Sequence, residues 1–294
     1  MTLPQRVLKM SLTCPVCNDT SYPYYEYKDF FGAPIWLYKC INCGHGSHDR
    51  QYTTQQFNEI YRADYAADYL VKEKALYQKR QVQYSQDIEL LLTCRKFSSV
   101  RVLDYGCSSG GYLDAMPAEW EKSGYEVNPF HINHLRDNKK HIAVFDRVDA
   151  IDRQFDLITM RGVIEHIPDH TQLIAFLGSH LVPSGSVFIT ATPDISSVCA
   201  TLYKSQWNQV VCPEHIHQFS STSLSILLAK AGLVLRSLNH PYMDTPYANW
   251  RQDKEQFAEN FRHLIRCSEA AITPKHAFAG NMISALYEKS EAPA

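Results

Sequence analysis

Two C-x-x-C pairs near the N-terminus have the residue type and spacing of a metal site. Cys14 pairs with Cys17 and Cys40 pairs with Cys43, with residues 18–39 between the pairs. Each pair can lie on a tight turn, and four thiolates form the tetrahedral sulfur set that Zn²⁺ prefers. Because four thiolates leave no open coordination position, the predicted zinc is structural. A thioredoxin-like redox pair would need one C-x-x-C beside a βαβ unit, and none is visible in the sequence.

A glycine-rich turn and a downstream carboxylate predict a nucleotide-like cofactor. Gly106 and Gly110 follow a strand-like run and open a helix-like one. Glycines let the backbone approach a ligand, and a helix N-terminus offers unpaired N–H groups. Glu126 stands at the end of the next strand-like run. A carboxylate there can accept hydrogen bonds from both hydroxyls of a ribose.

Two cofactor classes compete for this turn. A dinucleotide motif could use Gly106 and Gly111, but Ser108 replaces the middle glycine that admits a pyrophosphate. S-adenosylmethionine carries no phosphate, and its ammonium and sulfonium suit a carboxylate such as Asp104 at the strand tip. The pattern favours S-adenosylmethionine and leaves a nicotinamide-dependent oxidoreductase as the alternative.

Three histidines are candidates for the proton transfer that a hydroxyl acceptor requires. Methyl transfer depends on in-line positioning, and a hydroxyl must also lose its proton to a base. Histidine suits this role because its pKa lies near neutrality. We rank His166 first and His215 second as the base, each with a purely structural role as the alternative. His217 would share a face with His215 in an extended stretch, and Glu165 could join His166 at a metal, although nothing nearby completes such a site.

Alternating strand-like and helix-like segments must position these groups. Their lengths predict a doubly wound, mainly parallel α/β sheet. The expected strands are 100–103, 124–127, 142–145, 155–160, 186–191, 234–235 and 281–287, and the expected helices are 110–121, 131–138, 171–181, 221–231 and 257–267. Pro117 leaves open that the first of these helices kinks or ends early. A capping box at Thr53 and Gln56 opens a helical stretch before this region. Its tyrosines are expected to pack on the next domain or, at Tyr65 or Tyr69, to cover a ligand as a lid.

Several segments together resemble class I S-adenosylmethionine-dependent methyltransferases. Residues 102–111 resemble the first motif of that family, 155–169 its fourth-strand motif and 181–194 its fifth-strand region. Residues 213–232 resemble an element of a bacterial subgroup that often carries an N-terminal zinc ribbon. The resemblance implies a Rossmann-like sheet of seven strands with S-adenosylmethionine as cofactor.

The resemblance also implies roles for individual residues. Asp104, Gly106 and Gly110 would shape the cofactor pocket, and Glu126 would hold the ribose hydroxyls. Where Ser108 stands, the family usually has glycine. The full set of expected cofactor-binding residues is Asp104, Gly106, Cys107, Gly110, Glu126, Asp146 for the adenine (preferred to Asp149), and Arg161 for the methionine end or the acceptor.

The chain therefore divides, in our interpretation, into four parts. Residues 1–50 form a zinc ribbon and 51–97 a helical linker or lid. Residues 98–240 form the Rossmann-like methyltransferase core. Residues 241–294 hold a cap insertion over the acceptor site and a final strand, which is expected to be antiparallel.

Charge and hydropathy limit the partners. Lysine and arginine total 29 against 31 for aspartate and glutamate, so the net charge is −2 and no nucleic-acid partner is expected. No apolar run could span a bilayer and the N-terminus lacks a secretory signal, so we expect a cytoplasmic protein with no membrane partner. The resemblance implies O-methylation of a sugar, nucleotide sugar or other small polyhydroxylated metabolite. An RNA or protein methyltransferase that docks through the zinc ribbon remains an alternative, and the oligomeric state is not predicted.

Overall fold

A seven-stranded sheet forms the centre of the computed structural model, which describes residues 9–60, 71, 75–95, 100–207, 209, 215–266 and 278–290. Its order is β11-β12-β9-β8-β5-β6-β7. The strands are β5 (Arg101–Tyr105), β6 (Glu121–Tyr125), β7 (Ile142–Phe145), β8 (Phe155–Arg161), β9 (Leu181–Pro193), β11 (Leu233–Asn239) and β12 (Met282–Lys289). Strands β5 to β9 are parallel, and β12 is antiparallel to both β9 and β11. The predicted doubly wound sheet and the antiparallel last strand are confirmed.

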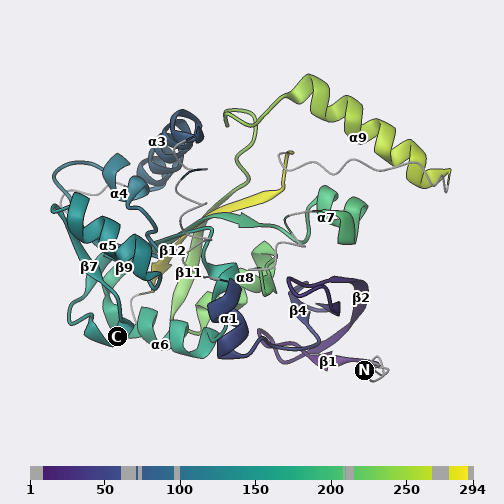
Figure 1. The fold of residues 1–294 in the computed structure, drawn as a ribbon, viewed down its shortest axis with the longest axis horizontal. Helices are drawn as coiled ribbons and strands as arrows, with labels where there is room; N and C mark the ends of the chain where they lie inside the picture. Colours follow the sequence, from purple (N-terminus) through teal and green to yellow (C-terminus); the bar gives the residue numbers. More distant parts are fainter. Residues whose placement is uncertain are drawn as a thin grey trace.

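Helices cover both faces of this sheet (Figure 1). One face packs against α3 (Tyr77–Cys94), α4 (Gly111–Ala115) and α5 (Pro129–Asn138), and the other against α6 (His170–His180) and α8 (Ser221–Ala229). Successive strand residues point to opposite faces. In β5, Val102 therefore packs in the α3 layer and Leu103 in the α6 and α8 layer. Both faces are apolar, and the carboxyl ends of β5 and β8 share one edge.

A second sheet joins the N-terminal strands to the C-terminal half of the chain. It contains β1 (Leu12–Thr13), β2 (Thr20–Lys28), β3 (Pro34–Cys40), β4 (Gly46–His48) and β10 (His217–Gln218), in that order. Strand β10 pairs antiparallel with β4, with His217 opposite Ser47. The cysteine-bearing strands are therefore continuous with the segment that carries His215 and His217.

Two predicted elements near the glycine turn have different bounds in the structure. The helix expected over 110–121 ends at Ala115, because Pro117 has no N–H to continue it. Residues 121–125 form β6, so the strand expected over 124–127 begins and ends earlier. Glu126 consequently follows the strand, in the turn that faces the glycine loop.

The remaining helices complete the described chain. The capping box is confirmed at α1 (Thr54–Ile60): the Thr53 amide donates to Gln56 Oε1 over 2.9 Å, and the Gln56 amide to Thr53 Oγ1 over 3.2 Å. Tyr65 and Tyr69, the predicted lid residues, lie outside the described residues. The others are η1 (Val148–Ala150), η2 (Ile164–His166), α7 (Val198–Tyr203), η3 (Lys204–Gln206) and α9 (Trp250–Ile265). Helix α9 lies between β11 and β12 in the chain and extends away from the sheet (Figure 1).

None of the helices that the structure describes combines the length and the apolar character needed to cross a bilayer.

Candidate active site

The loop after β5 has a backbone shape that requires glycine at two positions. Gly106 has φ +83°, and a Cβ there would lie 2.7 Å from Val163 Cγ2. Gly110, the N-cap of α4, has φ +79°, and its Cβ would lie 2.8 Å from Leu135 Cδ2. Left-handed backbone and close neighbours both exclude larger residues here. The loop is therefore built to keep its backbone open at the sheet edge.

Ser108 adopts the conformation for which a glycine is usual. Its φ is +48°, which is uncommon for a residue with a side chain. Its Oγ is buried and has no hydrogen-bond partner in the part of the chain that the structure describes. A buried hydroxyl without a partner is costly, so this group is available to a ligand in the loop.

Glu126 ties the turn after β6 to the glycine loop. Its Oε2 accepts a hydrogen bond from the Ser108 amide at 2.8 Å, and its Oε1 accepts from the Val127 and Asn128 amides at 2.8 Å each. A carboxylate has about four lone-pair positions, so capacity remains for a further donor. The side chain is nearly buried but not closed off, at 8% relative exposure. A ribose hydroxyl is a donor of the right kind.

Asp104 is a buried carboxyl at the end of β5. Thr159 Oγ1 donates to its Oδ1 over 2.8 Å. Burial raises the pKa of Asp104 to about 7, although the Thr159 bond and the charge of Arg161 oppose the shift. A cationic ligand beside it would favour the ionised form again.

The side chains of two further predicted residues have other contacts in the structure. Cys107 packs in the core, where its Sγ would lie 2.5 Å from a Cβ on Gly124, and only its backbone remains in the loop. Burial raises the pKa of Cys107 well above its usual value. Asp146 is exposed and pairs with Arg136 Nη2 at 2.9 Å. Its contact with adenine stays a prediction.

Arg161 belongs to a buried polar network that the sequence did not indicate. Its Nε lies 2.9 Å from Asp87 Oδ2, and Asp87 Oδ1 accepts from Thr190 Oγ1 at 3.0 Å. Thr190 Oγ1 also lies 2.7 Å from Ser284 Oγ. The guanidinium stands 4.9 Å from the ring centroid of Tyr84. Arg161 Nη2 is buried and has no hydrogen-bond partner among the described residues, so an anionic group could bind it.

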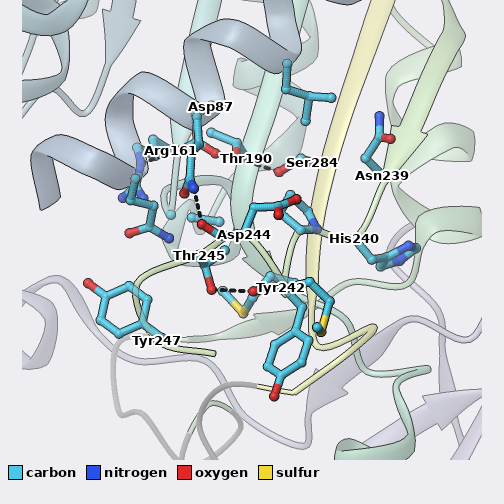
Figure 2. Close-up of a pocket in the computed structure, with 18 of the residues that line it drawn as sticks. Asp87, Arg161, Thr190, Asn239, His240, Tyr242, Asp244, Thr245, Tyr247 and Ser284 are labelled. Atoms are coloured by element: carbon cyan, nitrogen blue, oxygen red, sulfur yellow. Dashed lines mark hydrogen bonds and ion pairs between the residues drawn. The ribbon is translucent and has the colours of Figure 1, made fainter. Parts of the chain in front are cut away.

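Asp87, Arg161, Thr190 and Ser284 line a cleft of about 1190 Å³ at the carboxyl edge of the sheet. Figure 2 shows Asp87, Arg161 and Thr190 on one side of it and Asp244 and Tyr247 on another. The walls come from α3, the ends of β8 and β9, the segment after β11 and strand β12. Both α3 and the segment after β11 lie outside the predicted Rossmann core. The cleft is large enough for a small organic molecule.

The two histidines ranked as candidate bases lie next to each other in the lining of this cleft. His166 lies on η2, His215 lies just before β10, and their ring centroids are 4.8 Å apart. Glu165 Oε1 lies 4.0 Å from His215 Nε2, and Glu165 Oε2 accepts from Thr192 Oγ1 at 3.1 Å. Burial raises the pKa of Glu165, with His215 opposing the shift.

His217 belongs to a separate cluster at the junction with the N-terminal sheet. Its Nδ1 lies 3.2 Å from His45 Nε2, and its ring centroid is 4.1 Å from that of His170. Burial lowers the pKa of His45 to about 3 and that of His170 to about 4, so this cluster is neutral near pH 7. His215 and His217 therefore have different surroundings, whereas the extended pattern placed them on one face.

The four N-terminal cysteines converge as predicted. Their sulfurs all lie within 4.8 Å of one another, and the close pairs are Cys14–Cys43 at 3.6 Å and Cys17–Cys40 at 3.4 Å. Zn–S bonds of about 2.3 Å would place tetrahedral sulfurs about 3.8 Å apart. Burial opposes ionisation of Cys40, but N–H donors from Cys43 and Asn42 outweigh it and lower its pKa to about 7. The donor set and its spacing fit a zinc ion.

The fold and the loop after β5 define a Rossmann-like α/β enzyme of the class that uses S-adenosylmethionine. Residues 77–238 match the family model described as a methyltransferase domain. The chain belongs to this family and is an S-adenosylmethionine-dependent methyltransferase.

Known proteins similar to this chain agree with that class. A ubiquinone biosynthesis O-methyltransferase from Xylella fastidiosa is 23% identical over 197 residues, which cover 62% of this chain and 77% of that protein. A chain of the complex between the Haloferax volcanii Trm112 methyltransferase activator and a methyltransferase has a TM-score of 0.54 at 13% identity, over 78% of this chain and 97% of that one. The plantazolicin methyltransferase BpumL, solved with S-adenosylhomocysteine, has a TM-score of 0.52 at 9% identity, over 80% and 93% of the two chains. At such identities the two structures support the fold alone.

Proposed function

We propose that this enzyme transfers the methyl group of S-adenosylmethionine to a hydroxyl of a small polyhydroxylated molecule, such as a sugar or nucleotide sugar, held in the cleft. The observation that carries this proposal is that His166 and His215 both line the cleft. Its rim offers amide, carboxyl and hydroxyl groups together with tyrosine rings, including Gln83, Asn239, Asp244, Thr245 and Tyr247. Such a lining suits hydroxyl groups and the faces of sugar rings. The O-methyltransferase name of the Xylella relative supports transfer to oxygen.

The cofactor would bind at the loop after β5. When bound, S-adenosylmethionine supplies a methyl group on a positively charged sulfur. Asp104 would face its cationic part, and Glu126 would accept the ribose hydroxyls with its remaining lone pairs. The left-handed Gly106 and Gly110 and the unpartnered Ser108 hydroxyl fit a ligand in this loop. Cys107 and Asp146 stay predicted members of this pocket, through backbone and adenine contacts respectively.

Residues in the cleft would orient the acceptor. Asp87 and Thr190 hold Arg161 in place, so its free Nη2 can bind a carboxylate or phosphate of the cofactor or acceptor without reorganising. His166 or His215 would take the proton of the acceptor hydroxyl as its oxygen attacks the methyl carbon. Holding acceptor and methyl in line accounts for much of the rate.

We also infer one structural zinc ion at Cys14, Cys17, Cys40 and Cys43. The ribbon that it would stabilise is bonded to the catalytic region at two places: β4 pairs with β10, and Ser220 Oγ donates to the Cys43 carbonyl over 2.7 Å. Both contacts lie shortly after His215 in the chain. A zinc-stabilised ribbon would therefore keep one wall of the acceptor site in position.

A substrate screen tests this function. Full-length enzyme is incubated with S-adenosylmethionine and a panel of sugars, nucleotide sugars, phenols, tRNA and peptides, and release of S-adenosylhomocysteine is measured. We expect a hydroxyl compound to respond, with the product methylated on oxygen by NMR. His166→Ala and His215→Ala should lower the rate about 10²-fold or more without changing cofactor affinity.

The exposed His141→Ala is the matched control and should retain full activity, because His141 pairs with Asp114 outside the cleft. Turnover of tRNA or a peptide alone would refute the small-molecule assignment in favour of the docking alternative. The family match already favours methyl transfer over the nicotinamide alternative.

A further inference from the structure

Three side chains in the lining of the cleft form a second group of potential metal ligands. Glu165, His166 and His215 each offer one ligand atom, and these atoms all lie within 4.8 Å of one another. Glu165 and His166 come from η2, whereas His215 comes from the segment joined to the ribbon. The group therefore forms only in the folded chain. It is distinct from the four-cysteine group, which lies in the N-terminal sheet.

The hydrogen bonding of His215 fixes which of its ring nitrogens faces the group. Its Nδ1 lies 2.6 Å from the carbonyl oxygen of Gln209, which can only accept a hydrogen bond. Nδ1 therefore carries a proton, and Nε2 is the ring nitrogen that can present a lone pair to the group. A metal-binding histidine commonly donates its second N–H in this way, because the bond orients the ring.

The lone pair of His215 and the carboxylate of Glu165 face each other. Glu165 Oε1 lies 4.0 Å from His215 Nε2, and the Glu165 side chain is 2% exposed. No lysine or arginine in the described ranges lies within ion-pair distance of Glu165. Two acceptors that face each other in a buried place are stabilised by a positive charge between or beside them, which a proton or a metal ion can supply. A bare carboxylate there is costly without a counter-charge.

The donor set selects the kind of cation. Two imidazole nitrogens and one carboxylate oxygen form the arrangement that holds divalent first-row metals with open coordination positions. The remaining positions would face the cleft, because His166, His215 and Glu165 all line it. A site with three protein ligands and open positions is of the catalytic type, unlike the closed four-thiolate set.

We propose that Glu165, His166 and His215 bind a divalent first-row metal ion that holds the acceptor hydroxyl in the cleft. This proposal deepens the proposed function and rests on it. The ion would lower the pKa of the bound hydroxyl, whose proton leaves to solvent. The oxygen then forms the O–C bond to the methyl group, and the electron pair of the broken C–S bond stays on sulfur. The two histidines serve as ligands, and the ion takes the role otherwise given to a histidine base.

The first test measures metal binding without any reaction. Full-length protein that retains its zinc is titrated with Mn²⁺, and free Mn²⁺ is followed by electron paramagnetic resonance. Mn²⁺ suits nitrogen and oxygen ligands and is disfavoured by thiolates, so the ribbon should not compete. We expect about one site per chain. Glu165→Gln and His166→Ala should each weaken binding at least tenfold, and His141→Ala should leave it unchanged.

Two variants are used because the substitution of buried Glu165 could unfold the protein, whereas His166 is only half-buried. Circular dichroism checks both, and His166→Ala alone suffices if Glu165→Gln unfolds. Absence of a site in folded wild-type protein, or unchanged binding in a folded His166→Ala variant, would overturn the proposal.

A second measurement separates this proposal from the proposed function. Methylation of a hydroxyl compound by protein shown to lack Mn²⁺ and other ions at this site would refute the metal and leave the function standing. A metal site in a protein that methylates no hydroxyl compound would refute the function and leave the metal-binding residues assigned. A tenfold or larger rise in the activity of metal-depleted protein on addition of a divalent ion would support both the metal site and the proposed function.

Discussion

Cofactor binding should depend on pH through Asp104. Burial raises the pKa of this carboxyl to about 7 in the free protein, against an ordinary value of 3.8. The cationic cofactor prefers the ionised form, so the carboxyl must lose its proton on binding below pH 7. The apparent Kd scales as one plus the ratio of protonated to ionised carboxyl. It should be about tenfold weaker at pH 6 than at pH 8, or about 1.4 kcal/mol.

Isothermal titration calorimetry with S-adenosylmethionine measures this effect. Titrations in two buffers of different ionisation enthalpy should show release of about 0.9 proton at pH 6 and about 0.1 at pH 8. Asp104→Asn retains the shape of the side chain and removes its charge. This variant should bind more weakly at pH 8 and lose the tenfold pH dependence.

The same shift has a consequence for the free protein. Between pH 4 and 7 the folded chain holds a proton on Asp104 that the unfolded chain has lost. This group therefore lowers the free energy of unfolding as the pH rises through that window. A wild-type Kd that is constant from pH 6 to pH 8, with no proton release, would refute the reasoning. Equal pH dependence in Asp104→Asn would assign the effect to another group.

Two further predictions concern the loop and the ribbon. Gly106→Ala should lower the free energy of unfolding by about 1–2 kcal/mol because the left-handed backbone disfavours a side chain, and the contact with Val163 should lower it further. The same variant should bind the cofactor more weakly. Urea unfolding measures the first effect and calorimetry the second. The control is Gly178→Ala in helix α6, where no atom lies within 4 Å of the added Cβ. This variant should stabilise the protein by about 0.5–1 kcal/mol. A lower free energy of unfolding in both variants would contradict the argument. The Cys14→Ser and Cys40→Ser double variant should lose about one zinc per chain by elemental analysis and melt at lower temperature; an unchanged melting temperature without zinc would show that the ribbon does not need the metal.

Short sequence patterns predicted many of the strands and turns, because these elements depend on residues that are close together in the chain. The parallel strands are short apolar runs that are buried on both faces, so each one is recognisable from its own residues. Gly106 and Gly110 are recognisable because their left-handed backbone admits little else. Cys14, Cys17, Cys40 and Cys43 are recognisable because each pair is held by its own turn. Pro117 also has a local effect, and the early end of the helix before it is an outcome that the sequence itself indicated.

The cleft at the carboxyl edge of the sheet depends on contacts between residues far apart in the chain, which no short sequence pattern indicates. Asp87 reads as an ordinary polar residue on a helix, and its role appears only when Arg161, 74 residues away in the sequence, pairs with it. His215 is close to Glu165 and His166 only because the sheet brings η2 and the segment before β10 together. Two neighbouring histidines, His215 and His217, diverge because β10 pairs with β4. Such pairings depend on how the whole chain packs.

The sequence by itself determined the class of enzyme, the cofactor loop and the cysteine cluster, because each depends on residues close together in the chain. Only the tertiary structure decided what lines the cleft. Helix α3, the segment after β11 and the segment before β10 come together there from distant parts of the chain. Burial in the folded chain, and no property of the isolated residues, raises the pKa of Asp104 and of Glu165.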